Sequence, residues 1–300
     1  MPDKPKLSLI ICSKDRSEKL KQCLQTISAE EILQVGGELI LVNNNSTDDT
    51  EEIMRNFQKK APFPVHVITE PKTGLSHARN AALCKVRGEV IVFTDDDCFL
   101  TKEYLIKAGA IFDSGEFDYC SGQILPYGSD ARIGVATFNV KYTIEPHTFL
   151  NAGWIQGANM IFSKRLIEKT GFFDTTLGAG TAFLSEDLDY AARANSLGFK
   201  GARIPDLIIY HHHGRTSWQD IQSTVKGYDY GRGAYYMKCI MRGELISLRW
   251  WYRYLRHSKY NVRREACGAL LYLVTRLFFF DLNSKSLSRN YENRLSSTGT

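Results

Sequence analysis

Short apolar runs and stretches of helical spacing alternate along residues 7–93, and this alternation restricts the fold more than any other feature. The apolar runs, which have the length of buried strands, are 7–12, 38–42, 65–69 and 89–93. Helices are expected between them at 17–28, 46–58 and 75–86, the second beginning at a capping Ser46. Because apolar strands that alternate with helices form parallel sheets covered on both faces, we predict an α/β, Rossmann-like fold with a mostly parallel central sheet and flanking helices.

The second half of the chain has a mixed pattern. Strands are expected at 117–125, 159–163 and 206–213, with a loop rich in glycine and threonine at 171–181. A helix is expected over 185–198, with Ser185 as its cap and acidic residues in its first turn. We therefore expect one α/β domain with halves at 1–110 and 111–215, followed by a mostly helical extension at 216–300.

Cysteine usage and hydropathy indicate a cytoplasmic protein. The seven cysteines are odd in number and lack CxxC spacing, which favours reduced thiols over a disulfide framework or a zinc site. Lys4 and Lys6 lead directly into the first strand, so no signal peptide is expected. The longest apolar segment, 268–280, is shorter than the roughly 18 residues of a spanning helix and carries Arg276. We expect the protein in the cytoplasm, either free or at the inner face of the membrane.

Charge is distributed unevenly between the body of the chain and its C-terminal region. Residues 216–300 hold 14 Lys or Arg against 6 Asp or Glu, a net charge of +8, whereas residues 1–215 carry −3. Arginines alternate with Trp and Tyr over 247–260. Such a region can dock on an anionic membrane surface, form a homodimer or bind nucleic acid. We favour membrane contact or self-association and expect no nucleic-acid partner.

Polar and charged residues follow each of the four N-terminal strands. They occupy positions 13–16, 43–46, 72–74 and 95–97. Because ligands of such sheets bind beyond the carboxyl ends of the strands, we expect these side chains to meet at one edge. The set combines amides, cations and carboxylates, which a metal-bound polyphosphate requires and a neutral ligand does not.

Three consecutive aspartates end the fourth strand. Asp95 and Asp97 should point the same way, because alternate side chains of an extended segment share a face, while Asp96 points elsewhere. Carboxylates this close repel each other, and a divalent cation removes that repulsion. Oxygen ligands favour Mg²⁺ or Mn²⁺. The alternative is a solvated acidic turn.

Two later clusters also carry candidate chemistry. Glu186, Asp187 and Asp189 open the helix at 185–198, where acidic residues also stabilise the helix without any further role. His211 and His213 share one face at the end of the last strand, and His212 faces away. This histidine run offers a metal ligand or a phosphate contact, or it is an incidental strand end at the surface.

Four blocks in this order resemble the family 2 glycosyltransferases of the bacterial type, which have the GT-A fold. The blocks are LIICSKDR; LILVNNNSTDDT; GLSHARNAAL with GEVIVFTDDDC; and GANMIFSKRLIEKTGFFDTTLGAGT with SEDLDYAARANSLGFK and IIYHHHGR. The resemblance covers about residues 7–215. It implies a nucleotide-sugar donor bound by the first half of the α/β domain, and an acceptor bound by the second half.

The resemblance also implies roles for individual residues. In the donor site, these would be Ser13, Asp15 and Arg16 around the base and ribose, Asn44 at the base, Arg79 at the base or phosphates, and Asp95 at the ribose or metal shell. Asp97 would be the direct ligand of Mn²⁺ or Mg²⁺ in the DxD motif. His211, with His213 close behind, would complete the metal or diphosphate site. Asp96 would contact the transferred sugar or support the loop.

The family pattern makes Asp187 the catalytic base, ionised at its helix N-terminus. Trp154, Asn159 and Glu186 would lie on the acceptor side, although Trp154 is equally typical of a buried core. The loop 175–184 would close over the site as a lid. One departure is Asn43, where the family usually has aspartate, which leaves the contact to the base open. A Q-x-x-R-W segment, which processive synthases carry, does not follow Asp187.

These features predict an inverting glycosyltransferase. It would move a sugar from a nucleoside-diphosphate-sugar, a UDP-sugar in first place, to a hydroxyl acceptor in glycan, polysaccharide or glycolipid synthesis. The acceptor would be a glycan or lipid-linked. A non-catalytic module that binds nucleotide sugars is the alternative. A sugar nucleotidyltransferase is disfavoured, because residues 12–20 lack the glycine-rich phosphate loop of that class.

Overall fold

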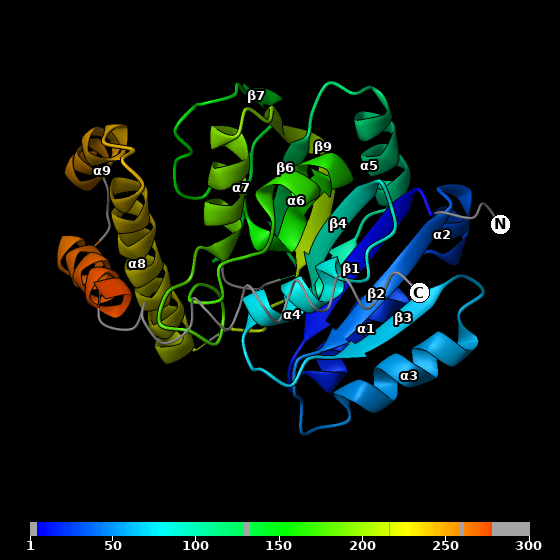
Figure 1. Ribbon diagram of the computed structural model, residues 1–300. Helices are drawn as coiled ribbons and strands as arrows, with labels where there is room; N and C mark the ends of the chain where they lie inside the picture. The colour runs from blue at the N-terminus through cyan, green and yellow to red at the C-terminus, as the bar shows by residue number, and fades with distance from the viewer. Residues whose placement is uncertain (1–4, 129–132, 216, 258–260, 278–300) are drawn as a thin grey trace. The chain divides into compact units, whose positions relative to one another are not determined.

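The computed structural model describes residues 5–128, 133–215, 217–257 and 261–277. The chain forms two compact units. The first comprises Met1–Thr181 with Ser185–Val225, and the second comprises Ala182–Leu184 with Lys226–Thr300. The first unit contains the sheet and its covering helices, and the second contains helices (Figure 1).

The first unit is built on one mixed sheet, whose described part has nine strands. The strands are β1 (Leu7–Ser13), β2 (Gly37–Asn43), β3 (Val65–Thr69), β4 (Val90–Asp95), β5 (Cys98–Leu100), β6 (Tyr119–Pro126), β7 (Tyr142–Ile144), β8 (Met160–Ser163) and β9 (Gly201–His211). Their order is β3-β2-β1-β4-β8-β6-β9-β5, with β7 paired to β9. The first four strands of this order are parallel, and beyond β4 the pairs are antiparallel except for β6 with β9, which is parallel. The predicted α/β fold is therefore confirmed, with a sheet that is parallel only in part.

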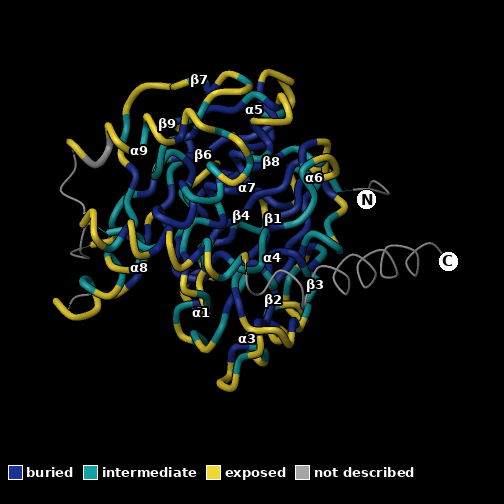
Figure 2. The backbone as a smooth tube through the Cα atoms, turned by 60° about the vertical axis from the view of Figure 1, so that its left-hand side comes forward, coloured by how far each residue is buried: buried dark blue, intermediate teal, exposed yellow. Residues whose placement is uncertain are grey.

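Seven helices of the first unit lie before or between these strands. They are α1 (Ser17–Gln25), α2 (Ala29–Gln34), α3 (Thr50–Lys60), α4 (Leu75–Leu83), α5 (Tyr104–Asp113), α6 (Lys164–Thr170) and α7 (Glu186–Ser196). Side chains of α1, α2, α3 and α5 join Leu7, Leu9 and Ile11 in one apolar core. On the opposite face, Phe93 of β4 packs edge-on against Phe173, which stacks on Tyr190 of α7. The central strands are buried along nearly their whole length (Figure 2).

One helix begins later than predicted, and neither of the two expected serine caps makes a capping hydrogen bond. α3 starts at Thr50 and not at Ser46, because the Ser46 hydroxyl accepts the backbone N–H of Asp15 at 3.0 Å. This bond commits residues 46–49 to a loop that is tied to the end of β1. Ser185 precedes α7, but its side chain makes no capping hydrogen bond and its backbone φ is +126°. The capping interpretation of both serines was therefore wrong.

Asn159 is a core residue, which corrects its expected place on the acceptor side. Its side chain is fully buried and accepts a hydrogen bond from the Tyr104 hydroxyl at 2.6 Å. Its amide nitrogen donates to the carbonyls of Gln123 at 2.9 Å and Leu207 at 3.0 Å. These bonds join α5, β6 and β9 at the β-bulge between Gly122 and Gln123. The side-chain amide of Asn159 thus makes its hydrogen bonds inside the core and does not offer them to a ligand.

The bulge requires a glycine, so we predict that Gly122→Ala destabilises the protein by about 2 kcal/mol or more. A Cβ at this position would lie 2.1 Å from the Leu207 carbonyl oxygen, a backbone atom that cannot rotate away. The measurement is the midpoint of urea unfolding.

Gly109→Ala is the matched control, because a Cβ there meets nothing within 4 Å. Since Gly109 lies inside α5, this change should stabilise by about 0.5–1 kcal/mol. Equal midpoints for the two variants would contradict the account of the bulge.

The second unit is helical, as the sequence predicted for the C-terminal region. α8 (Trp218–Met241) starts before the boundary of the units and continues into it, followed by α9 (Ile246–His257) and a helix over 262–277. α8 and the helix 262–277 cross closely, because a Cβ at Gly233 would lie 1.9 Å from the Glu265 carbonyl oxygen. Among the residues described, none of the helices combines the length and apolarity needed to cross a bilayer.

Candidate functional site

The turn between β4 and β5 brings the aspartate triplet to the end of β9. Asp95 ends β4, residues 96–97 form the turn, and Cys98 starts β5. β5 pairs antiparallel with β9 so that Cys98 lies opposite His211. This places His211 Nε2 3.2 Å from Asp97 Oδ1, while the backbone N–H of His212 donates to the Asp97 carbonyl at 2.8 Å. The expected meeting of the triplet and the histidine run is therefore present.

Four side chains at this turn are close enough to hold one metal ion. The ligand atoms of Asp95, Asp97, Cys98 and His211 lie within 4.8 Å of one another. Burial raises the pKa of the Cys98 thiol well above its usual range, so the sulfur stays protonated and is a poor ligand. Two carboxylates and one imidazole remain. This donor set fits Mn²⁺, and the imidazole makes it less suited to Mg²⁺, which prefers oxygen ligands.

The Asp97–His211 pair is held in its charged form. Burial alone would raise the pKa of Asp97, but the hydrogen bond from His211 and the positive charge of Arg16 outweigh it and hold that pKa below its usual range. Burial would likewise lower the pKa of His211, yet its bond to Asp97 raises it. The two groups therefore form an ion pair, and a cation bound at Asp97 would replace the proton on His211.

Asp96 points away from this cluster, as the sequence predicted, and fastens the loop after β1. Its carboxylate accepts the Ser13 hydroxyl at 2.6 Å and lies 3.0 Å from Arg16 Nη1. Arg16 Nη2 reaches Asp97 Oδ2 at 2.5 Å, so one guanidinium bridges both carboxylates. Burial, opposed by Arg16, raises the pKa of Asp96 to about 7. Ser13 and Arg16 thus lie at the acidic turn, where the sequence placed them.

Both oxygens of Asp97 already have partners, His211 on Oδ1 and Arg16 on Oδ2. A metal ion on Oδ1 would take the place of the His211 proton, whereas one on Oδ2 would compete with Arg16. Arg16 is the more mobile candidate, because its side chain is 33% exposed and that of His211 is 10% exposed. A guanidinium displaced from these carboxylates would remain at the rim of the site, where it could meet phosphate.

Asn44 and Asp15 are used to connect loops, which differs from their expected contacts with a base and ribose. The Asn44 amide donates to the Lys72 carbonyl at 2.7 Å, and its oxygen accepts the Gly74 N–H at 2.8 Å. Asp15 accepts the Thr47 N–H at 2.6 Å. Sequence alone does not distinguish an amide that faces a ligand from one that satisfies the backbone of its own loop.

Arg79 is the buried cation between the two acidic clusters. Its side chain, on α4, is 2% exposed; Nη1 lies 2.6 Å from Glu186 Oε1, and Nη2 lies 3.6 Å from Asp95 Oδ1. The guanidinium also lies near the rings of Phe93 and Phe173. Because Glu186 is committed to this ion pair, the structure does not support its expected contact with an acceptor.

Asp187 lies beside this pair, at the start of α7. Its carboxylate accepts the Gly157 N–H at 2.6 Å and the Leu188 N–H at 2.7 Å. Gly157 also packs on Arg79, since a Cβ there would lie 2.5 Å from Nη2. Burial and the charge of Glu186 raise the pKa of Asp187 to about 7, against Arg79 and the two N–H donors. This corrects the expectation that the helix terminus keeps Asp187 firmly ionised.

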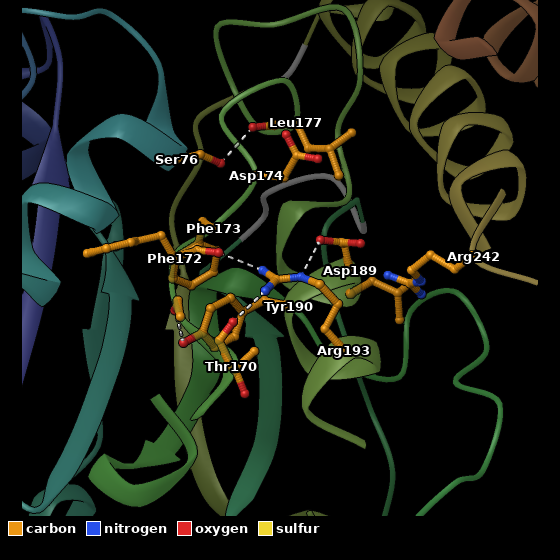
Figure 3. A network of polar contacts seen from close by, with 12 residues as sticks. Ser76, Thr170, Phe172, Phe173, Asp174, Leu177, Asp189, Tyr190, Arg193 and Arg242 are labelled. Carbon is orange, nitrogen blue, oxygen red and sulfur yellow. Dashed lines mark hydrogen bonds and ion pairs between the residues drawn. The ribbon is translucent and has the colours of Figure 1, made fainter. Parts of the chain in front are cut away.

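Hydrogen bonds secure the loop before α7 on both sides (Figure 3). Ser76 of α4 donates to the Leu177 carbonyl at 2.6 Å, and Asn80 exchanges two hydrogen bonds with the backbone of Phe173. Arg193 of α7 binds Asp189 and donates to the carbonyls of Thr170 and Phe172. These bonds hold Phe173 and Leu177, before and near the start of the predicted lid 175–184, whose closure stays a prediction.

Trp154 packs on β7, which pairs with the start of β9, whereas His213 follows the end of that strand. The Trp154 ring packs edge-on against Tyr142, with centroids 5.0 Å apart, and is partly buried. His213 lies 5.2 Å from His211, ring to ring, and its Nδ1 accepts the Arg215 N–H at 2.8 Å. The two histidines share a side, as predicted, whereas His212 packs with Phe99.

Two models of known protein families match this chain. The model of glycosyl transferase family 2 matches residues 8–171, which is more than half of the chain and includes the acidic turn. The chain belongs to glycosyl transferase family 2. A second model, glycosyl transferase family group 2, matches residues 90–287. The expected family is confirmed, and so, at the level of the family, is the expectation of a glycosyltransferase enzyme.

Individual relatives of this family 2 protein are distant in sequence. Glycosyltransferase AglE of Haloferax volcanii is 23% identical over 210 residues, which are 69% of this chain and 67% of AglE. The matched regions of two other curated relatives are 25% and 53% of their own lengths. The chain therefore spans only part of the length of these two relatives.

Two solved structures share the fold. Mannosyltransferase PcManGT from Pyrobaculum calidifontis, in complex with GDP-Man and Mn²⁺, has a TM-score of 0.62 at 16% identity and covers 98% of this chain and 81% of its own. Residues 1–349 of TarS from S. aureus, in complex with UDP-GlcNAc, have a TM-score of 0.58 at 16% identity, covering 95% and 77%. These likenesses confirm the expected GT-A fold.

The acidic turn should bind Mn²⁺ through Asp97, so Asp97→Asn is expected to weaken Mn²⁺ binding by more than about 100-fold. The variant loses a charged ligand and the partner that keeps His211 oriented. Electron paramagnetic resonance of free Mn²⁺ during a titration measures the affinity directly. Asp206→Asn is the control, because Asp206 is an exposed carboxylate on the same strand as His211. Similar Mn²⁺ affinities in the two variants would place the ion elsewhere.

Proposed function

We propose that this family 2 protein is an inverting glycosyltransferase. It transfers a sugar from a nucleoside-diphosphate-sugar, a UDP-sugar in first place, to a hydroxyl group of a glycan or lipid-linked acceptor. One observation carries the proposal. A cluster of donors suited to a divalent cation and the partly buried Asp187 carboxylate, whose pKa is raised to about 7, flank a single buried cation, Arg79.

Asp95, Asp97 and His211 would hold Mn²⁺ or Mg²⁺ on the donor side. When bound, such an ion neutralises the negative charge that develops on the departing diphosphate. Arg16 and Ser13, which border the acidic turn, would contact the donor. PcManGT with GDP-Man and Mn²⁺, and TarS with UDP-GlcNAc, are nucleotide-sugar complexes of proteins with this fold, which supports a donor of the same class.

Asp187 would accept the proton of the attacking hydroxyl. Its pKa of about 7 suits a general base at neutral pH, because the ionised form is populated and still basic enough to take a proton. Glu186 cannot share this role while it is bonded to Arg79. A single base with direct attack on the anomeric carbon gives inversion, since no enzyme nucleophile intervenes.

The acceptor would approach from the side of Gly157 and the segment before it. The backbone N–H of Gly157 donates to Asp187. Trp154, which precedes Gly157 in the same segment, packs against Tyr142. Tyr142 is 50% exposed, so the pair offers an aromatic surface on which a sugar ring could stack. On this basis Trp154 would contact the acceptor. The acceptor would belong to glycan, polysaccharide or glycolipid synthesis.

Asp187→Asn should reduce transfer by about 10³-fold while donor affinity stays within a few fold, because a general base contributes to chemistry and not to donor binding. Transfer is measured by release of nucleoside diphosphate in a screen of UDP- and GDP-sugars, and donor affinity by calorimetry with Mn²⁺. Asp97→Asn should instead lose donor binding, and transfer is lost with it. Wild-type protein that binds a donor but transfers to no acceptor would favour a binding module instead.

The pH dependence of kcat/KM should report the ionisation of Asp187. Since the base acts only when ionised, kcat/KM is expected to rise about tenfold per unit from pH 5 and to level off above about pH 7. Asp96 also has a pKa raised to about 7, so Asp96→Asn serves as the control. The midpoint of the pH profile should be unchanged in Asp96→Asn, even if kcat/KM itself is lower. Disappearance of the midpoint in Asp96→Asn would assign the titration to Asp96 and contradict the proposed base.

A further inference from the structure

The described part of the second unit buries two of its three acidic side chains. Asp229 and Glu265 have almost fully buried side chains, and both bind Arg232 of α8. Trp251 of α9 donates to Glu265 at 2.8 Å and stacks on Tyr236. Glu244, which is 28% exposed, is paired with Arg242 at 2.9 Å. These are the acidic residues in the described part of the unit, so its acids contribute little charge to the surface.

Five of the positive charges in the described part of the unit are exposed. Its exposed cations are Lys226, Arg249, Arg253, Arg256 and Arg263. Arg249, Arg253 and Arg256 recur at spacings of three and four residues along α9, so they lie along one side of that helix. In the described part of the unit, the exposed cations therefore outnumber the exposed acids, and its surface carries net positive charge.

An apolar stripe is exposed beside these cations. On the helix 262–277, Leu270, Val274 and Leu277 lie on one side and are 62%, 38% and 66% exposed. The opposite side of that helix holds buried Glu265, Gly268, Ala269 and Tyr272. On α9, Leu248 and Tyr252 are 47% and 62% exposed next to the arginines. Both helices therefore have a solvent-exposed apolar side, which no other helix covers within the described residues.

We propose that this basic-apolar face, formed by the exposed side chains of α9 and of the helix 262–277, binds an anionic lipid bilayer. Exposed leucines and valines insert among acyl chains at the interface, and arginines contact the lipid phosphates. A second copy of the chain would bring like charges together on both sides of the contact. Nucleic acid would pair with the arginines but leave the leucines in water. An anionic bilayer satisfies both features, and the inference does not depend on the proposed donor or base.

The test is flotation of the full chain with vesicles in a density gradient. One vesicle is phosphatidylcholine alone, and the other also contains about 30% phosphatidylglycerol. The protein should float with the anionic vesicles, bind phosphatidylcholine at least tenfold more weakly, and lose most binding when salt rises to about 0.5 M.

Two variants separate the charge from the apolar contribution. The triple change Arg249→Gln, Arg253→Gln and Arg256→Gln should weaken binding to anionic vesicles about 100-fold. The double change Leu270→Ser and Leu277→Ser should weaken it at least tenfold, since two large apolar side chains no longer enter the bilayer. All five positions are exposed, so both variants should fold, which circular dichroism and Mn²⁺ binding check.

Matched controls carry the same changes on the first unit. Lys59→Gln, Lys60→Gln and Lys102→Gln remove the same charge from exposed positions, and Leu33→Ser with Leu197→Ser remove two exposed leucines. Binding in these controls should stay within twofold of the unaltered protein.

Three results would overturn the proposal. The first is equal vesicle binding by the α9 triple variant and its lysine control. The second is a stable dimer in sedimentation that Leu270→Ser with Leu277→Ser converts to monomer, without vesicle binding. The third is salt-sensitive binding to duplex RNA or DNA that the arginine variant abolishes and the leucine variant leaves intact, again with no vesicle binding.

Discussion

The buried guanidinium of Arg79 is the interaction on which the site depends. It lies between Asp95 at the end of β4 and Glu186 at the start of α7, and it is carried by α4. Removing one partner from a buried charge pair typically costs about 3–5 kcal/mol, because the other charge is left uncompensated. The pair therefore fixes the acidic turn relative to α7. Gly157 completes the arrangement, since any side chain there would collide with the guanidinium.

This arrangement explains why two carboxylates of one site have opposite pKa shifts. Asp97 lies between the cations His211 and Arg16 and stays ionised. Asp187 is partly buried, borders Glu186 and receives only backbone N–H groups as direct donors, so its pKa is raised to about 7. One carboxylate is thus suited to a cation and the other to a proton. That separation is what a displacement at an anomeric carbon between a diphosphate and a hydroxyl requires.

Much of the fold was predictable, because the alternation of buried strands and helices is strong over the first hundred residues. The convergence of Asp95, Asp97 and His211 was predictable only as a resemblance, since the pairing that creates it uses β5, a strand of three residues with no periodic signal. Asn44, Asn159 and Glu186 show where residue type misleads. Each can bind a ligand, but tertiary contacts direct each one to backbone, core or Arg79. In the second unit, composition revealed the basic charge, while the burial of its acids became visible only in three dimensions.

The proposed chemistry depends on one cation site at the acidic turn. Diffraction from crystals grown with Mn²⁺ and UDP tests it most directly, because the anomalous signal locates manganese independently of the protein density. We predict one peak in contact with the Asp97 carboxylate and His211 Nε2, with the UDP phosphates on its open side and Arg16 moved off Asp97. Manganese located away from these residues, or UDP bound at the edge of the sheet with no cation at the turn, would contradict it.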